Sequence, residues 1–245
     1  MVGHTISKKS TKSARGPFNL HNTTFAVLRM FLDTMPLKDL YKLRKTSATV
    51  KSMSHFRGEI VKGLDINTDT VETPYRKCMS YSEYMNLKAP IKPYASLSVH
   101  MGSDIVTEAL VAKMKEKVYY DLDISGEYTW KDVITLLHPG ISKLSLYDHM
   151  DLPKEGMEEF FKMLVHCKIE GITFYTETGD SRWIDGAMKT WTSLIKTGTL
   201  KTVDFYEKNF NHFTAVTQDD STIELCMPIF DDDEGYEMSS DEEDN

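Results

Sequence analysis

The sequence is poor in cysteine, and its three cysteines are Cys78, Cys167 and Cys226. They are widely spaced, odd in number and form no C-x-x-C pair, which argues against a disulfide framework. Unpaired cysteines in this pattern are typical of a reducing compartment. We therefore expect reduced, buried thiols and a protein of the cytoplasm, the nucleus or both.

Long apolar runs and catalytic motifs are also missing. A membrane-spanning helix needs about 18 or more consecutive apolar residues, and the sequence has no such run. It has no G-x-S-x-G, P-loop, G-x-G-x-x-G or H-E-x-x-H motif. His166 and Cys167 are adjacent, which in a helix would point them apart, and Asp148, His149 and Asp151 lack the usual spacing of metal ligands. We therefore expect no catalytic residue, metal site, cofactor or membrane association.

Each end of the chain lacks charge of one sign. Residues 1–16 contain four bases and no acid, whereas residues 219–245 contain 12 acids and no base. The segment between them has equal numbers of acids and bases. A neutral body argues against nucleic-acid binding, which needs a concentrated basic face. The composition of the ends predicts a disordered basic arm at 1–16 and a disordered acidic tail at 229–245.

Residues 17–56 show helical patterning. Apolar residues recur there at helical spacing, and Thr23 and Thr24 could cap the first helix. Pro36 should end that helix, because proline donates no hydrogen bond and disfavours helical geometry in the residue before it. We expect a second helix from Leu37 and a third element through Val50. Three helices this short enclose little interior, so they should need support from the rest of the chain.

From residue 93 to 228 the pattern changes to short alternating strands with helical stretches between most of them. The strand starts recur with a mean spacing of about 25 residues, at Leu97, Leu122, Leu144, Ile172, Val203 and Ile223. A strand followed by a helix at this period is typical of a leucine-rich-repeat-like solenoid, in which stacked units share one core. A generic α/β domain with βαβ units is the alternative. Residues 57–92 form a linking region whose organisation the pattern does not define.

The N-terminal helical stretch "FNLHNTTFAVLRMFLDTMPLKDLYKLRKTSATVKSM" resembles an F-box, in particular the divergent, nematode-like F-boxes. Val27 with Leu28, and Phe31 with Leu32, stand for the family's two apolar pairs. Two departures are present: Thr23 and Thr24 replace a Leu-Pro pair, and Val50 replaces a tryptophan. Further positions match at the family's spacing, namely Pro36, Asp39, Leu40, Leu43 and Ser47.

The resemblance implies an adaptor without chemistry of its own. F-box proteins dock on a Skp-family linker subunit of a cullin ubiquitin ligase, and the rest of the chain captures a protein substrate. We thus expect an α/β protein in which a three-helix F-box-like segment precedes a strand–helix repeat domain that binds substrate through loops 148–154 and 176–183. The residues expected to bind the linker subunit are Leu20, Val27, Leu28, Phe31, Leu32, Pro36, Leu37, Leu40, Leu43 and Ser47.

Three alternatives stay open at this point. The helical segment could be a plain hairpin within one larger domain. The protein could be a repeat-type interaction module unconnected to ubiquitin. It could also be an enzyme whose site is assembled from residues distant in the sequence.

The acidic tail gives a first prediction. Ser239 and Ser240 precede the acidic run that begins Asp241, Glu242 and Glu243, so an acid-seeking serine kinase should phosphorylate them and add about −1.5 to −2 charges per site. Deleting residues 231–245 should leave the melting temperature unchanged, because nothing should pack there. A thermal scan that shows a loss of more than about 4 °C would identify the tail as a packed element.

Overall fold

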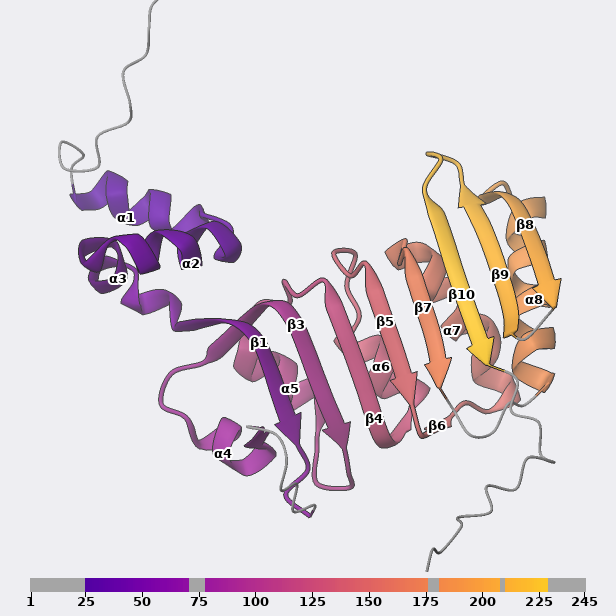
Figure 1. The fold of residues 1–245 in the computed structure, drawn as a ribbon, viewed down its shortest axis with the longest axis horizontal. Helices are drawn as coiled ribbons and strands as arrows, with labels where there is room; N and C mark the ends of the chain where they lie inside the picture. Colours follow the sequence, from indigo (N-terminus) through magenta and orange to yellow (C-terminus); the bar gives the residue numbers. More distant parts are fainter. Residues whose placement is uncertain (1–24, 71–77, 176–180, 208–209, 229–245) are drawn as a thin grey trace, which may run out of the picture.

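A mixed ten-stranded sheet with helices against it forms the body of the protein (Figure 1). The computed structural model describes residues 25–70, 78–175, 181–207 and 210–228. The strand order is β2-β1-β3-β4-β5-β7-β10-β9-β8, and β6 pairs with β4. The strands are β1 Glu59–Asn67, β2 Met79–Ser80, β3 Ile91–Met101, β4 Asp121–Thr129, β5 Lys143–Tyr147, β6 His149–Asp151, β7 Gly171–Tyr175, β8 Leu200–Glu207, β9 Phe210–Thr217 and β10 Thr222–Pro228.

Eight α-helices lie within the described residues. In sequence order they are α1 Phe25–Thr34, α2 Leu37–Thr46, α3 Ala48–Met53, α4 Tyr81–Asn86, α5 Thr107–Met114, α6 Trp130–Leu136, α7 Lys154–Cys167 and α8 Ser181–Lys196. Figure 1 shows α5 to α8 behind the sheet, all on the same face. The expectation of a mixed α/β fold that begins with three short helices is confirmed.

The parallel half of the sheet follows the order of the chain. β1, β3, β4, β5 and β7 lie side by side and run parallel, and α5, α6 and α7 each return the chain to the start of the next strand. In this arrangement a leucine lies beside a leucine across neighbouring strands, as in the pairs of Leu122 with Leu97 and with Leu144. Each strand–helix unit therefore continues the apolar layer of the previous one.

The two ends of the sheet differ from the expected sequential array. At one end β1, which lies in the 57–92 range, pairs in parallel with β3, so the sheet begins before residue 93. At the other end β10 lies beside β7, and β9 and β8 follow it as antiparallel strands. The strand that starts near Val203 is therefore at the far edge of the sheet, and β9 was not expected from the pattern. Short connections favour antiparallel pairing between neighbours in sequence, which explains why this last segment departs from the parallel order.

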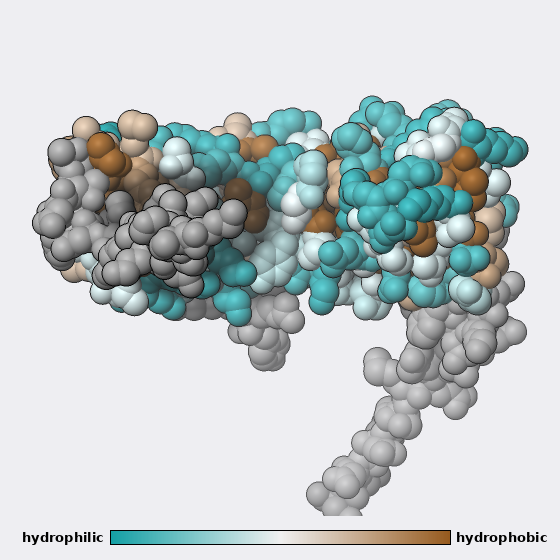
Figure 2. All heavy atoms as spheres, turned by 90° about the horizontal axis from the view of Figure 1, so that it is seen from above, coloured by the Kyte–Doolittle hydropathy of each residue, from teal (hydrophilic) through white to brown (hydrophobic). Residues whose placement is uncertain are grey.

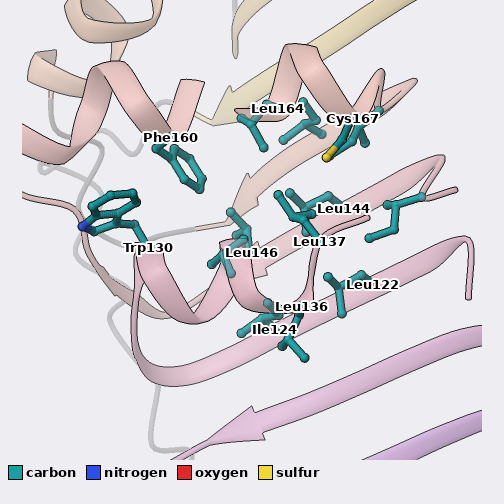
Figure 3. Close-up of a cluster of buried hydrophobic side chains, with 14 of the residues drawn as sticks. Leu122, Ile124, Trp130, Leu136, Leu137, Leu144, Leu146, Phe160, Leu164 and Cys167 are labelled. Atoms are coloured by element: carbon teal, nitrogen blue, oxygen red, sulfur yellow. The ribbon is translucent and has the colours of Figure 1, made fainter. Parts of the chain in front are cut away.

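The main core lies between the sheet and the helices behind it. Figure 3 shows Leu122 and Ile124 of β4 and Leu144 and Leu146 of β5, which point toward the helical layer. Full burial of each such side chain is worth roughly 1.5–3 kcal/mol. The helical side of this cluster consists of Trp130 and Leu136 of α6, Leu137 that follows it, and Phe160, Leu164 and Cys167 of α7. Burial raises the pKa of the Cys167 thiol, which is one of three free cysteines; Cys78 and Cys226 are only half-buried.

A second, smaller core holds the N-terminal helices together. We call residues 25–57 the helical module. Its interior is completed by Ile60 of β1, and Tyr94 of β3 packs against it. The other buried members are Leu28, Leu32, Met35, Leu37, Leu40 and Val50. The module thus depends on the sheet, as expected for three helices with little interior of their own.

Arg57 joins the helical module to the sheet. Its side chain is only 8% exposed, and its Nη1 atom donates to the carbonyl oxygens of Leu32 and Met35 at 3.1 and 3.2 Å. These carbonyls lie at the C-terminal end of α1, where a helix lacks internal donors and favours positive charge. The Nη2 atom of Arg57 lies 3.1 Å from Glu116, which also accepts a 2.7 Å hydrogen bond from Lys92.

The pKa of Glu116 reflects this network. Partial burial acts to raise it, but the hydrogen bonds and charges of Lys92 and Arg57 outweigh burial and hold the pKa below its ordinary value. Glu116 therefore stays ionised in the folded protein at neutral pH and balances the buried guanidinium.

Replacing this guanidinium should loosen the helical module. Arg57→Met keeps a long side chain but leaves three helix-end carbonyls and Glu116 without this donor, so the free energy of unfolding should fall by about 2–4 kcal/mol. Urea denaturation followed by circular dichroism measures the change. Arg29→Met is the matched control, because Arg29 is exposed and only lies over the ring of Phe56 at 4.9 Å. Equal stability of the two variants would contradict the role given to Arg57.

Candidate protein-binding surfaces

The face of the sheet opposite α5 to α8 is made of small and polar side chains. These side chains alternate along each strand with the buried residues of the core. Figure 1 shows none of the helices of the described residues in front of β4, β5 and β7. We call this surface the open face. Its members on the parallel strands are Gly63, Asp65, Ser96, Ser98, His100, Asp121, Asp123, Ser125, Lys143, Ser145, Tyr147, Gly171, Thr173 and Tyr175.

An uncovered parallel sheet is unusual. Parallel sheets are commonly covered by helices on both faces, and their strands are then apolar throughout. Here serine, threonine and aspartate occupy many of the alternate positions of the central strands, so water can solvate this face without loss of buried apolar area. The composition of the strands therefore explains why only one face carries helices.

Two stacked tyrosines lie at the carboxyl ends of β5 and β7 on the open face. The rings of Tyr147 on β5 and Tyr175 on β7 are nearly parallel, with centroids 4.7 Å apart and planes inclined by 7°. Tyr175 is 45% exposed. Partial burial is the main cause that raises the pKa of Tyr147, and the charges of Asp123 and Asp121 raise it further. Two carboxylates and a pair of aromatic rings therefore share this part of the face.

The helical module contacts the sheet through two tyrosine rings. Tyr94 of β3 packs against Tyr41 of α2 with ring centroids 4.9 Å apart. Farther along, His100 Nδ1 lies 2.8 Å from Ser125 Oγ on the neighbouring strand. The helical module therefore adjoins the sheet near the start of β3.

A groove lies at the carboxyl ends of β3 and β4. It is an open depression of about 560 Å³, lined in part by Ser103, Glu127, Tyr128, Asp132, His149 and Asp151. Within the residues that the structure describes, no group of three or more histidine, cysteine, aspartate or glutamate side chains could hold a metal ion.

The expected substrate loop 148–154 contributes to this groove but is mostly not a loop. Its residues His149–Asp151 form β6, which pairs with β4, and α7 begins at Lys154. Gly126 precedes the part of β4 that pairs with β6; its φ is 86°, and its backbone N–H donates to Asp148 Oδ2 at 2.7 Å. Of the second expected loop, residues 176–180 lie outside the described residues and α8 begins at Ser181.

Four of the eight described apolar residues expected to bind a linker subunit are buried within the chain. Their side chains form the small core of the helical module and are thereby removed from contact with a partner, as is the case for Leu28, Leu32, Leu37 and Leu40. Leu43 and Ser47 are half-buried, and Ser47 Oγ caps α3 by accepting from Val50 N at 3.2 Å. Leu20, Ser239 and Ser240 lie outside the described residues.

Three exposed apolar side chains form a stripe on α1. Val27 is 55% exposed, Met30 71% and Phe31 41%. Their spacing of three and four residues places them on one side of the helix. We call these three residues the α1 surface, and the exposed Pro36 lies just beyond the end of α1. Met30 was missed in the sequence, although its spacing from Val27 was a visible signal. Figure 2 shows brown, hydrophobic residues at the end of the molecule that carries this module.

Comparison with known proteins gives no independent assignment. A scan against protein-family models, a search of curated proteins and a search of solved structures each found no match to this chain. Among the described residues, no helix has both the length and the apolar character required to cross a membrane. The function is therefore argued from the surfaces described above.

The backbone conformation at Gly126 can be tested by substitution. A Cβ atom there would lie 2.3 Å from the carbonyl oxygen of Met101, in addition to the strain of a positive φ. Gly126→Ala should therefore lower the free energy of unfolding by more than about 2 kcal/mol. Gly198→Ala is the matched control, because its φ is 74° but nothing lies within 4 Å of its Cβ position. Chemical denaturation that gave equal losses for both variants would show that contact with Met101 is unimportant.

Proposed function

We propose that this protein is a non-catalytic adaptor of a Skp–cullin–F-box type ubiquitin ligase, acting in the cytoplasm, the nucleus or both. Its helical module binds a Skp-family linker subunit, and its sheet binds a protein substrate. The observation that carries the proposal is the α1 surface, where Val27, Met30 and Phe31 expose large apolar side chains side by side. Clustered exposed apolar side chains are characteristic of protein–protein contact sites.

The charge of the helical module supports a protein partner. Residues 25–57 contain seven bases and two acids, although the chain as a whole has a net charge of −8. Five of these bases are exposed, namely Arg29, Lys38, Lys42, Lys45 and Lys51. A basic rim around an apolar stripe favours a partner with an acidic surface, because complementary charges steer association and suppress wrong partners.

The remainder of the chain suits the second half of an adaptor. We propose that the strand–helix units from β1 to β7 form a leucine-rich-repeat-like array. This is a more specific description than the α/β fold that is observed. Such arrays present long surfaces to a partner because each unit adds one strand to the same face. In this protein that face is the open face.

A repeat-type interaction module unconnected to ubiquitin is the second candidate. It is favoured by the burial of Leu28, Leu32 and Leu40 in the small core and by the departures from the F-box pattern at Thr23, Thr24 and Val50. Under this interpretation the α1 surface binds a partner of another class.

The α1 surface provides the test of the adaptor. The double substitution Val27→Asp with Met30→Asp places two charges on exposed positions, so capture of a purified Skp-family subunit should fall at least about 30-fold while circular dichroism stays unchanged. Thr49→Asp with Ser52→Asp is the matched control, because it adds the same charge at exposed positions of α3. Leu40→Asp should instead unfold the helical module, because Leu40 is fully buried.

Two results would count against the ligase adaptor. Undiminished capture by the Val27/Met30 variant would exclude the α1 surface as the contact. A wild-type chain that captures no Skp-family subunit at all would leave the module unconnected to ubiquitin as the better description.

A further inference from the structure

The open face carries an excess of negative charge. Five carboxylates project from it, and on β3, β4, β5 and β7 Lys143 is the one exposed lysine or arginine on this face. Lys143 lies beside Asp121 on the neighbouring strand and offsets part of its charge. The carboxylates belong to Asp65, Asp121, Asp123, Asp204 and Glu224.

Short side chains separate some of these carboxylates across the sheet. In one row across the sheet, Asp65 and Asp123 are separated by Ser98 on β3, so their Cα atoms are about 10 Å apart at the usual strand spacing. Ser145 and Thr173 continue the same row beyond Asp123. Because these side chains are short, the backbone of an extended peptide can approach the sheet. The peptide's own longer side chains can then reach the carboxylates.

The stacked tyrosines also favour a positively charged ligand. A cation, and a planar guanidinium above all, binds favourably over the face of an exposed aromatic ring. The ring of Tyr175 is held by its stack on Tyr147 and is partly open to solvent. Carboxylates and a tyrosine ring near one another therefore select positive charge and disfavour nucleic-acid phosphates.

We propose that the open face binds an extended, arginine-containing segment of the protein substrate, with Asp121 and Asp123 pairing with its cations and Tyr175 stacking on a guanidinium. This inference rests on the proposed function, because it names the class of substrate that the sheet would capture. The two proposed binding surfaces then carry opposite charge, because the helical module is basic and the open face is acidic.

The test uses the full chain and a fluorescein-labelled peptide of alternating arginine and serine, with fluorescence anisotropy as the readout. Asp121→Asn with Asp123→Asn should weaken binding by about five- to tenfold, as expected for two partly solvated ion pairs. Tyr175→Ala should weaken it by about two- to fivefold through loss of the cation–π contact. A peptide with glutamate in place of arginine should not bind.

The matched control removes the same charge from the opposite side of the molecule. Glu155→Gln with Glu159→Gln changes two exposed carboxylates on α7 and leaves the acidic tail intact, so its affinity for the peptide should equal that of the wild type. If this control loses as much affinity as the Asp121/Asp123 variant, or if the latter loses none, the peptide responds to net charge or to the tail and the proposal is overturned. Self-association of the peptide-free chain that is abolished by Asp121→Asn with Asp123→Asn would also overturn it, because a second copy would then occupy the face.

The two proposals fail separately. Capture of the Skp-family subunit is measured on the same Asp121/Asp123 variant, and it should match the wild type because neither aspartate belongs to the helical module. Peptide binding that depends on both aspartates, in a chain that captures no linker subunit, would support the open face and reject the ligase connection. Normal linker capture with peptide binding that is insensitive to the aspartates would reject the open face alone.

Discussion

The arrangement of the α1 surface and the open face depends on the hydrogen bonds and the ion pair made by the buried guanidinium of Arg57. Three helices of ten residues or fewer cannot hold their own positions, and their small core is completed by Ile60 and Tyr94 from the sheet. Arg57 adds directional bonds to this apolar contact, because it joins the end of α1 to Glu116. Hydrogen bonds fix an orientation that apolar burial alone leaves free. The α1 surface is therefore displayed at a defined place beside the sheet.

Covering only one face of the sheet has a functional consequence. The helices between the strands are placed together on one side, so the apolar layer is buried once and the other side stays in water. Side chains such as Ser98 and Thr173 then lie outside the apolar core. The chain thereby presents a basic, partly apolar module and an acidic sheet face on the same molecule, and the proposed adaptor role assigns one partner to each.

Much of the fold could be predicted from the sequence, because helices and strands leave local periodic patterns. The three N-terminal helices and the strands through Leu97, Leu122, Leu144 and Ile172 follow from apolar spacing of 3.6 and 2 residues. β1 was not predicted from the sequence, because its alternation of apolar and polar residues is short and charged residues surround it. The order of β10, β9 and β8 could not be predicted, because strand pairing depends on contacts between residues far apart in the sequence.

The candidate surfaces also combine features that the sequence predicts with features that only the tertiary structure shows. The sequence by itself determined that α1 is amphipathic, that the strands alternate and that no familiar catalytic motif is present. Only the tertiary structure decided that Leu28 and Leu40 belong to the chain's own core while Val27 and Met30 face solvent. Periodicity identifies which residues share a side of an element, since that is set by local backbone geometry. Whether this side is covered depends on which distant segment packs against it, and no local pattern carries that information.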